Sequence, residues 1–209
     1  GVIHGGDDVA MNAWAAEVER KDDRPLMSSF HAMWSLGAGI GAGTGVITSF
    51  YKIAMPMHFT MTSIVIFLAM LTIITTPFRS EKKQKKNKEP FISFPKGALL
   101  PVAFITFFAS LGEGIVADWS AIFLRSIAEL DNSNAALGFT VFSICMFTMR
   151  LMGDKIALRF GASMTARYSG LIAFLGSIIV LTFNSLVPLV IGFGLIGIGI
   201  AVIIPLAFS

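Results

Sequence analysis

Residues 150–161, with the sequence RLMGDKIALRFG, place four charged side chains and two glycines between two long apolar runs. Over the whole chain of 209 residues, 55% are hydrophobic and only 14% are charged. The mean hydropathy of the chain is +0.76. Soluble globular domains do not usually have this composition, which is typical of a protein that lies in a membrane. The charge in residues 150–161 therefore predicts a connection that leaves the apolar phase.

The apolar runs on both sides predict membrane-spanning helices, each of which needs roughly 20 mostly apolar residues. Six runs of this kind cover residues 29–49, 55–78, 97–117, 134–152, 163–182 and 186–208. A soluble bundle is disfavoured because six such runs would leave almost no surface for water. The predicted fold class is all-α, a polytopic bundle of transmembrane helices, in which residues 150–161 form the short turn between the fourth and fifth spans.

Lysine and arginine fall in or beside alternate connections between these runs. The segment before the first run and the connections after the second and fourth hold three, seven and four of the sixteen basic residues, whereas the connections between them hold Lys52 and Arg125. Basic loops stay in the cytoplasm, so we predict that these three connections are cytoplasmic. The most polar one, residues 79–90 (RSEKKQKKNKEP), is either a solvated loop that sets the topology or a site for anionic lipid headgroups, with about 1 kcal/mol for each basic residue.

The composition also argues against several classes of protein. Cys145 is the single cysteine, so neither an internal disulfide nor a multi-cysteine metal site can form. The sequence pI is about 9.2, but the basic residues form no face with interleaved aromatics, as nucleic-acid binding would need. Nucleotide loops, zinc spacings and Ser-His-Asp arrangements are not found, and we expect no enzyme activity, no catalytic residue, no metal and no cofactor. Because the chain begins with Gly1 and ends directly after an apolar run, we expect a piece of a longer protein.

The order of residues in 150–161 resembles the loop motif of major facilitator superfamily transporters, a turn with Gly and Asp, a basic residue, and then Arg-x-Gly. After Gly161 the usual basic pair of the family is replaced by Ala-Ser. In that family the acidic residue and its basic neighbours pair across helices and cap a helix terminus, which latches the cytoplasmic side. The resemblance implies a role as a conformational latch for Arg150, Gly153, Asp154, Lys155, Arg159 and Gly161.

Residues 8–13 (DVAMNA) and 24–37 (RPLMSSFHAMWSLG) resemble the end of the fourth helix and the start of the fifth helix in a bacterial inner-membrane subgroup of these permeases. The resemblance implies a twelve-helix fold of two six-helix halves. Residues 1–78 would end the first half, residues 79–96 would form the cytoplasmic basic linker, and residues 97–209 would supply the first four helices of the second half. We expect a multi-pass monomer in the bacterial inner membrane.

Small and aromatic residues in the first span suggest two further sites. Gly37, Gly41 and Gly45 recur every fourth residue and form a stripe that predicts close packing of helices, rather than contact with a ligand. His31 and Trp34 lie three residues apart on one face. Either His31 titrates near neutral pH, or the two side chains form an aromatic anchor at the membrane interface.

A carboxylate in the third span is the strongest candidate for proton or substrate coupling. Glu113 lies between Gly112 and Gly114, and an intramembrane carboxylate costs about 2.5–3.5 kcal/mol, so we expect it to face a cavity or a partner. The two glycines predict a bend or break of the helix at this point. Asp118 and Trp119 follow, and they either help to bind a polar solute or belong to an ordinary outer helix end.

The predicted function is secondary active transport of a small polar solute, a sugar or another metabolite. The energy would come from protons, and the mechanism would be alternating access. Glu113, Asp118, Trp119, His31 and Trp34 are the candidates for substrate or proton coupling. The expected partners are the solute, protons and the lipid bilayer. The alternatives are efflux of amphipathic compounds and a transporter-like membrane sensor without net transport.

Overall fold

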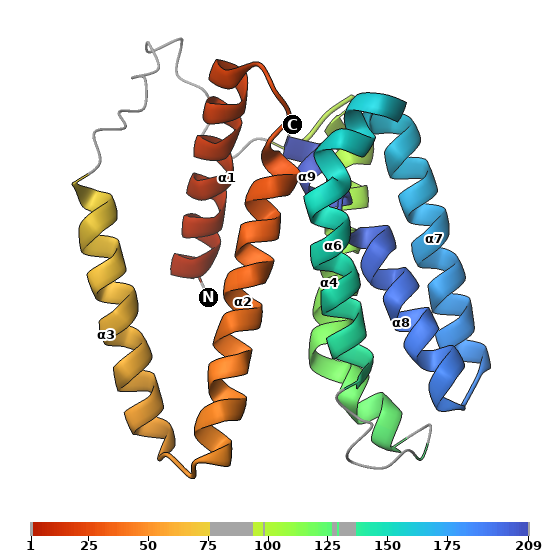
Figure 1. The fold of residues 1–209 in the computed structure, drawn as a ribbon. Coiled ribbons are helices and arrows are strands. Elements are labelled where there is room, and N and C mark those ends of the chain that lie inside the picture. Colours follow the sequence, from red (N-terminus) through yellow and green to blue (C-terminus); the bar gives the residue numbers. More distant parts are fainter. Residues whose placement is uncertain (1, 76–93, 98, 127–128, 130–136, 209) are drawn as a thin grey trace. The chain divides into compact units, whose positions relative to one another are not determined.

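The computed structural model describes residues 2–75, 94–97, 99–126, 129 and 137–208, which form helices joined by short connections (Figure 1). No strand occurs among these residues, and the predicted all-α class is confirmed. Most of the predicted linker, residues 79–93, lies outside the described residues. The helices are α1 (Val2–Asp22), α2 (Met27–Phe50), α3 (Met55–Ile74), α4 (Leu99–Ser126), α6 (Leu137–Phe160), α7 (Ala162–Thr182), α8 (Leu186–Ile200) and α9 (Ile203–Phe208).

The chain forms two compact units. Unit 1 combines Gly1–Ser35 with Phe91–Ser209, and unit 2 is Leu36–Pro90. Unit 1 therefore contains α1, the first turns of α2, α4 and α6 to α9, whereas unit 2 contains the rest of α2 and α3. The assignment of residues 1–78 and 97–209 to the two halves of a twelve-helix fold stays a prediction.

The core of unit 1 surrounds α8, which packs against both α6 and α7 (Figure 1). Glycines allow this close packing, because a Cβ placed on Gly176 of α7 would lie 2.7 Å from the carbonyl oxygen of Gly192 in α8. The buried cluster comprises Val116, Leu124, Phe142, Met146, Val180, Leu189, Phe193, Ile196, Ile200, Ala201 and Val202. These residues come from α4, α6, α7, α8 and the turn after α8, so four long helices share one core.

A break separates α8 from α9. Helix α8 ends at Ile200 and α9 begins at Ile203. Pro205 lies four residues after Ala201 and has no N–H group, so the carbonyl of Ala201 cannot receive the usual helical hydrogen bond. The next carbonyl, that of Val202, does accept one, from the backbone N–H of Leu206 at 3.0 Å. The break therefore leaves one specific backbone oxygen for another partner.

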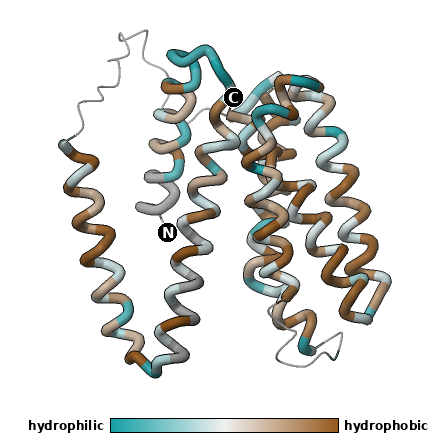
Figure 2. The backbone as a smooth tube through the Cα atoms, in the orientation of Figure 1, coloured by the Kyte–Doolittle hydropathy of each residue, from teal (hydrophilic) through white to brown (hydrophobic). Residues whose placement is uncertain are grey.

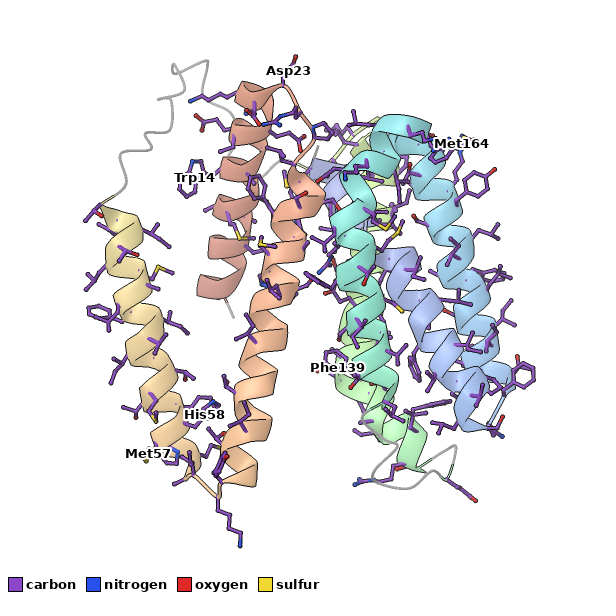
Figure 3. The ribbon with its side chains drawn as sticks, viewed as in Figure 1. Trp14, Asp23, Met57, His58, Phe139 and Met164 are labelled. Atoms are coloured by element: carbon purple, nitrogen blue, oxygen red, sulfur yellow. The ribbon has the colours of Figure 1, made fainter. Side chains whose placement is uncertain are left out.

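Unit 2 is a hairpin of α2 and α3. Lys52 in the turn has φ 53°, and the backbone N–H of Ile53 donates to the carbonyl of Thr48 at 2.9 Å. Pro56 lies in the first turn of α3, where its missing N–H is not needed. Thr44 Oγ1 and His58 Nε2 lie 3.2 Å apart, which ties the two helices together near the end of α3 that carries His58 (Figure 3).

Four helical segments are long and apolar enough to cross a membrane: α3, α4, α7 and α8 with α9. Helices α2 and α6, which form the two other predicted spans, do not belong to this group among the described residues. In unit 1, hydrophilic residues gather at the α1–α2 turn and near the α6–α7 connection, whereas α8 is hydrophobic along its length (Figure 2). Figure 3 places Asp23 and Met164 at that hydrophilic end and Phe139 toward the opposite one.

The structure corrects the predicted turn at residues 150–161 and the predicted helix break at Gly112 and Gly114. Residues 150–160 are helical as part of α6, and Gly161 alone connects α6 to α7, with φ 81° and ψ 151°. Hydropathy indicates where a chain leaves the apolar phase, but this helix ends only where a glycine adopts a backbone that other residues avoid. Helix α4 runs through Gly112 and Gly114 without a break, because a glycine keeps its N–H and costs a helix only about 1 kcal/mol; the predicted bend stays a prediction. The break lies instead before Pro205.

Candidate functional site

Asp154 caps the N-terminus of α2. Its Oδ1 accepts a hydrogen bond from the backbone N–H of Ser28 at 2.9 Å. Its Oδ2 accepts one from the backbone N–H of Ser29 at 2.9 Å and one from the hydroxyl of Ser29 at 2.5 Å. The first N–H groups of a helix have no partner within the helix, and a carboxylate also suits the positive end of its dipole. Residues more than 120 positions apart in the sequence are joined in this way.

Glu19 of α1 completes the same cap. Its Oε2 accepts the backbone N–H of Leu26 at 2.7 Å and that of Met27 at 2.8 Å. The first bond within the helix then runs from the N–H of Phe30 to the carbonyl of Leu26. Two carboxylates from two different helices therefore satisfy the four N–H groups that the start of α2 leaves unpaired. We call Glu19, Asp154 and these four N–H groups the α2 cap.

Gly153 allows α6 to approach the α2 cap. A Cβ at this position would lie 2.7 Å from Val202 Cγ1 and 2.9 Å from Ser28 Cβ, closer than real side chains come. The hydroxyl of Ser28 donates to the carbonyl of Arg150 at 2.7 Å, in a buried position. The glycine before the aspartate is therefore needed because two helices and the α8–α9 turn meet there.

Arg150 is the centre of a second group of contacts, one turn before Asp154 on α6. Its side chain is 1% exposed. Nε donates to the freed carbonyl of Ala201 at 3.2 Å, and the two terminal nitrogens donate to Ser35 Oγ at 2.5 Å and Glu113 Oε2 at 3.2 Å. The ring of Trp34 lies 5.9 Å from the guanidinium carbon. We call Arg150, Glu113, Ser35 and the Ala201 carbonyl the Arg150 cluster.

The ion pair of this cluster joins helices α4 and α6 in the interior of unit 1. Glu113 lies in the middle of α4, and its side chain is 21% exposed. Removing one partner of a buried ion pair costs about 3–5 kcal/mol, because the other charge is left uncompensated. The sequence predicts a cavity or a partner for Glu113, and the structure supplies a partner, Arg150. The proton-coupling role of Glu113 stays a prediction.

His31 belongs to a third group, between α1 and α2. Its Nε2 lies 3.0 Å from Asn12 Oδ1, and the side chain is 8% exposed. The side-chain nitrogen of Asn12 donates to the carbonyl of Asp8 at 3.0 Å. The carbonyl of His31 accepts the hydroxyl of Ser35 at 3.1 Å, so the α1–α2 contact and the Arg150 cluster share one serine. Trp34, by contrast, is half exposed.

The other predicted site residues lie apart from these contacts. Lys155 and Arg159 are exposed on the last turns of α6, where the guanidinium of Arg159 lies over the ring of Phe160. Asp118 and Trp119 are exposed on α4. A Cβ at Gly37 or Gly41 would meet nothing within 4 Å, and the surroundings of Gly45 lie outside the described residues. The roles predicted for these residues stay predictions.

Sequence reasoning missed four members of the site. Ser28 and Ser35 carry no local signal, because each acts through contact with a helix far away in the sequence. Glu19 carries none because its contact depends on how α1 folds back onto the start of α2. The freed carbonyl of Ala201 did have a signal, since Pro205 within an apolar run predicts an unpaired carbonyl four residues earlier.

A pocket of about 360 Å³ opens beside the α2 cap. Arg20, Glu19 and the α1–α2 turn line one wall, whereas Ala162 and parts of α6 and α9 line the other. All of these residues belong to unit 1. The pocket therefore marks where α1 and α2 meet α6, α7 and α9 at the hydrophilic end.

Comparison with known proteins gives consistent matches over the whole chain. The family model of the Major Facilitator Superfamily matches residues 1–209. The uncharacterized transporter y4wD of Sinorhizobium fredii is 38% identical over 209 residues, which are all of this chain and 55% of that protein. An uncharacterized MFS-type transporter of Yersinia pestis is 32% identical over 209 residues, all of this chain and 54% of that protein. The membrane protein MosC of Rhizobium meliloti is 25% identical over 213 residues, with all of this chain and 51% of that protein covered. No solved structure matches the chain.

The apolar helices and these matches define a multi-pass helical membrane protein. The chain belongs to the major facilitator superfamily. It spans about half the length of the curated relatives that it matches.

Proposed function

We propose that the full-length protein is a secondary active transporter. It moves a small polar solute, a sugar or another metabolite, by alternating access and couples this movement to protons. Asp154 acts as a latch on one side of the molecule, and Glu113 accepts the proton. The protein acts as a monomer in the inner membrane of a bacterium, with its basic connections in the cytoplasm. The bacterial relatives that are named as transporters support this proposal.

The observation that carries the proposal is the position of Asp154 and Arg150 on successive turns of α6. Asp154 binds the N-terminus of α2, and Arg150 binds Ser35 of α2 as well as Glu113 of α4. One short segment of α6 therefore contacts both the latch and the carboxylate proposed to take the proton. A change of charge at Glu113 reaches the α2 contacts through one side chain, which is the connection that coupled transport needs.

Opening of the latch is physically feasible because water can replace its bonds. Asp154 and Ser29 are half-buried, and the N–H groups of α2 can be hydrated once the helices part. A hydrogen bond exchanged for one with water contributes only about 0.5–1.5 kcal/mol net. The cap is thus strong enough to favour one conformation and weak enough to be released in each transport cycle.

The test of proton coupling uses the full-length transporter and its Glu113→Gln variant in proteoliposomes. The amide oxygen of the introduced glutamine can still accept the hydrogen bond from Arg150, but the side chain cannot bind and release a proton. We expect uptake driven by a proton gradient to be lost, while exchange of labelled solute for unlabelled solute persists. Wild-type proton dependence in the variant would exclude Glu113 from the mechanism. Binding without exchange in the wild type would instead favour a sensor, and transport that runs only outward would favour efflux.

The test of the latch uses Asp154→Asn. The amide nitrogen of the new residue faces a backbone N–H of α2, so one hydrogen bond is replaced by two opposed donors. We expect slower exchange with nearly unchanged solute affinity. Asp23→Asn is the matched control, because Asp23 is an exposed aspartate in the α1–α2 turn. Equal exchange rates in both variants would exclude the latch role.

A further inference from the structure

The Arg150 cluster has one positive and one negative charge. Helices α8 and α9 contain no ionisable residue. Helix α2 contributes His31, which is bonded to Asn12, and the uncharged Ser35 and Trp34. Helix α1 contributes Asp8, whose contact is also with Asn12. Among the residues that the structure describes here, Glu113 is therefore the carboxylate that balances Arg150.

The guanidinium of Arg150 has N–H groups that could bind a further carboxylate. Arg150 forms one hydrogen bond from each of its three nitrogens, and its contact with Glu113 is a single bond of 3.2 Å. A guanidinium has five N–H groups, and it binds a free carboxylate best through two parallel bonds. Two of the N–H groups are thus not used by these contacts, and a third is held by the hydroxyl of Ser35.

Helix α2 supplies two of the contacts of Arg150. Ser35 and Trp34 belong to α2, whereas Glu113 and Ala201 belong to elements that share the core of unit 1 with α6. In the transport cycle proposed above, opening of the latch would part α2 from α6 and would remove Ser35 and Trp34 from Arg150. Arg150 would keep its bonds to Glu113 and to the Ala201 carbonyl, and the N–H group that Ser35 holds would become free for a solute.

We propose that Arg150 binds the carboxylate of a small organic anion and that one proton binds to Glu113 together with it. This inference rests on the proposed function and specifies its solute. The proton passes from water to a carboxylate oxygen of Glu113, which becomes neutral, and the carboxylate of the solute takes its place as the counterion of Arg150. One anion and one proton enter the cluster, so its net charge is the same before and after loading.

Charge balance makes the coupling obligatory. A proton alone would leave Arg150 buried without a counterion, and an anion alone would place two carboxylates beside one guanidinium. Both half-loaded states are disfavoured because an uncompensated charge in the protein interior is costly. The two ligands therefore bind together or not at all, which predicts electroneutral symport with one proton for each monocarboxylate.

The test measures the thermal stability of the purified full-length transporter with three pools of small solutes: monocarboxylates such as lactate, pyruvate and acetate; neutral polyols and sugars; and amines. We expect stabilisation by the monocarboxylate pool, stronger at acid than at alkaline pH. Glu113→Gln should bind the same pool without pH dependence, because its side chain is neutral at every pH. Arg150→Lys should weaken the binding roughly tenfold or more, because the two-bond geometry is lost. Arg125→Gln, at the far end of α4 and outside the cluster, should behave as the wild type.

The outcomes separate this inference from the proposed function. No stabilisation by monocarboxylates at acid pH, or unchanged pH dependence in Glu113→Gln, would overturn the inference. The Glu113→Gln result holds even if Arg150→Lys does not fold. If polyols or sugars are taken up in a proton-dependent way while monocarboxylates are not, the proposed function stands and the inference falls. If no pool is transported in proteoliposomes, the proposed function itself fails.

Discussion

The α2 cap and the Arg150 cluster lie one turn apart on α6, and they hold their neighbours by different means. In the cap, two carboxylates accept hydrogen bonds from backbone N–H groups at a hydrophilic end of unit 1. In the cluster, a guanidinium that is 1% exposed pairs with a carboxylate and with a carbonyl that a proline leaves free. The cap joins elements by hydrogen bonds that water can replace, and the cluster joins them by an ion pair whose guanidinium is buried.

This difference indicates which contacts could change in the proposed transport cycle. In that proposed cycle, water would compensate the N–H groups of the cap when the helices part, so the cap could open and close. The ion pair has no such substitute and must stay intact or exchange one counterion for another. We therefore expect substitutions in the cluster to affect stability most, and substitutions in the cap to affect mainly the balance between conformations.

Arg150→Gln should have the largest effect. The substitution leaves the carboxylate of Glu113 without a counterion and the carbonyl of Ala201 without its donor. We expect the full-length protein to lose about 3–5 kcal/mol of stability, which thermal unfolding in detergent would detect. The double variant with Glu113→Gln should recover much of this loss, because no charge is then left unpaired. A single variant as stable as the wild type would show that the ion pair does not form.

Gly153→Ala should have the next largest effect. The added Cβ would lie within 3 Å of Ser28 and Val202 atoms, and overpacking of this kind costs about 1–3 kcal/mol. The strain arises where α6 meets α2, so the closed conformation should be weakened. Cysteines placed at Arg20 and Ala162, which line the same pocket, should then cross-link less in a cysteine-free background. Gly170→Ala is the control, because a Cβ there meets nothing within 4 Å.

Much of the site could be predicted from the sequence, but its partners could not. The loop motif predicts that Asp154 caps a helix, and hydropathy predicts that Glu113 faces a cavity or a partner. Neither pattern specifies that the capped helix is α2 or that the partner is Arg150, because contacts between distant positions depend on how the helices pack. The glycines around Glu113 predicted a bend or a break, and the break is wrong, since glycine weakens a helix without removing a hydrogen bond. Pro205 removes one, and the break lies there.

Glu19→Ala should have the smallest effect of the three. Its Oε2 accepts two of the four N–H groups in the cap, and loss of a helix cap costs about 0.5–2 kcal/mol. Glu17→Ala is the matched control on the same helix, because Glu17 forms a partly exposed pair with Lys21 at 3.3 Å, and pairs of this spacing on a helix contribute only about 0.3–0.5 kcal/mol.

Glu19→Gln separates the hydrogen-bond component from the charge component of the stability that Glu19 contributes. Its amide oxygen can still accept hydrogen bonds, but the interaction of a negative charge with the helix dipole is lost, which costs about 0.3–1 kcal/mol. We expect the thermal stability of Glu19→Gln to lie between those of the wild type and Glu19→Ala. If Glu19→Ala is no less stable than Glu17→Ala, then Asp154 alone maintains the start of α2. In that case Asp154 would be the one carboxylate of the cap that contributes to stability. Opening of the proposed latch would then expose all the N–H groups at the start of α2.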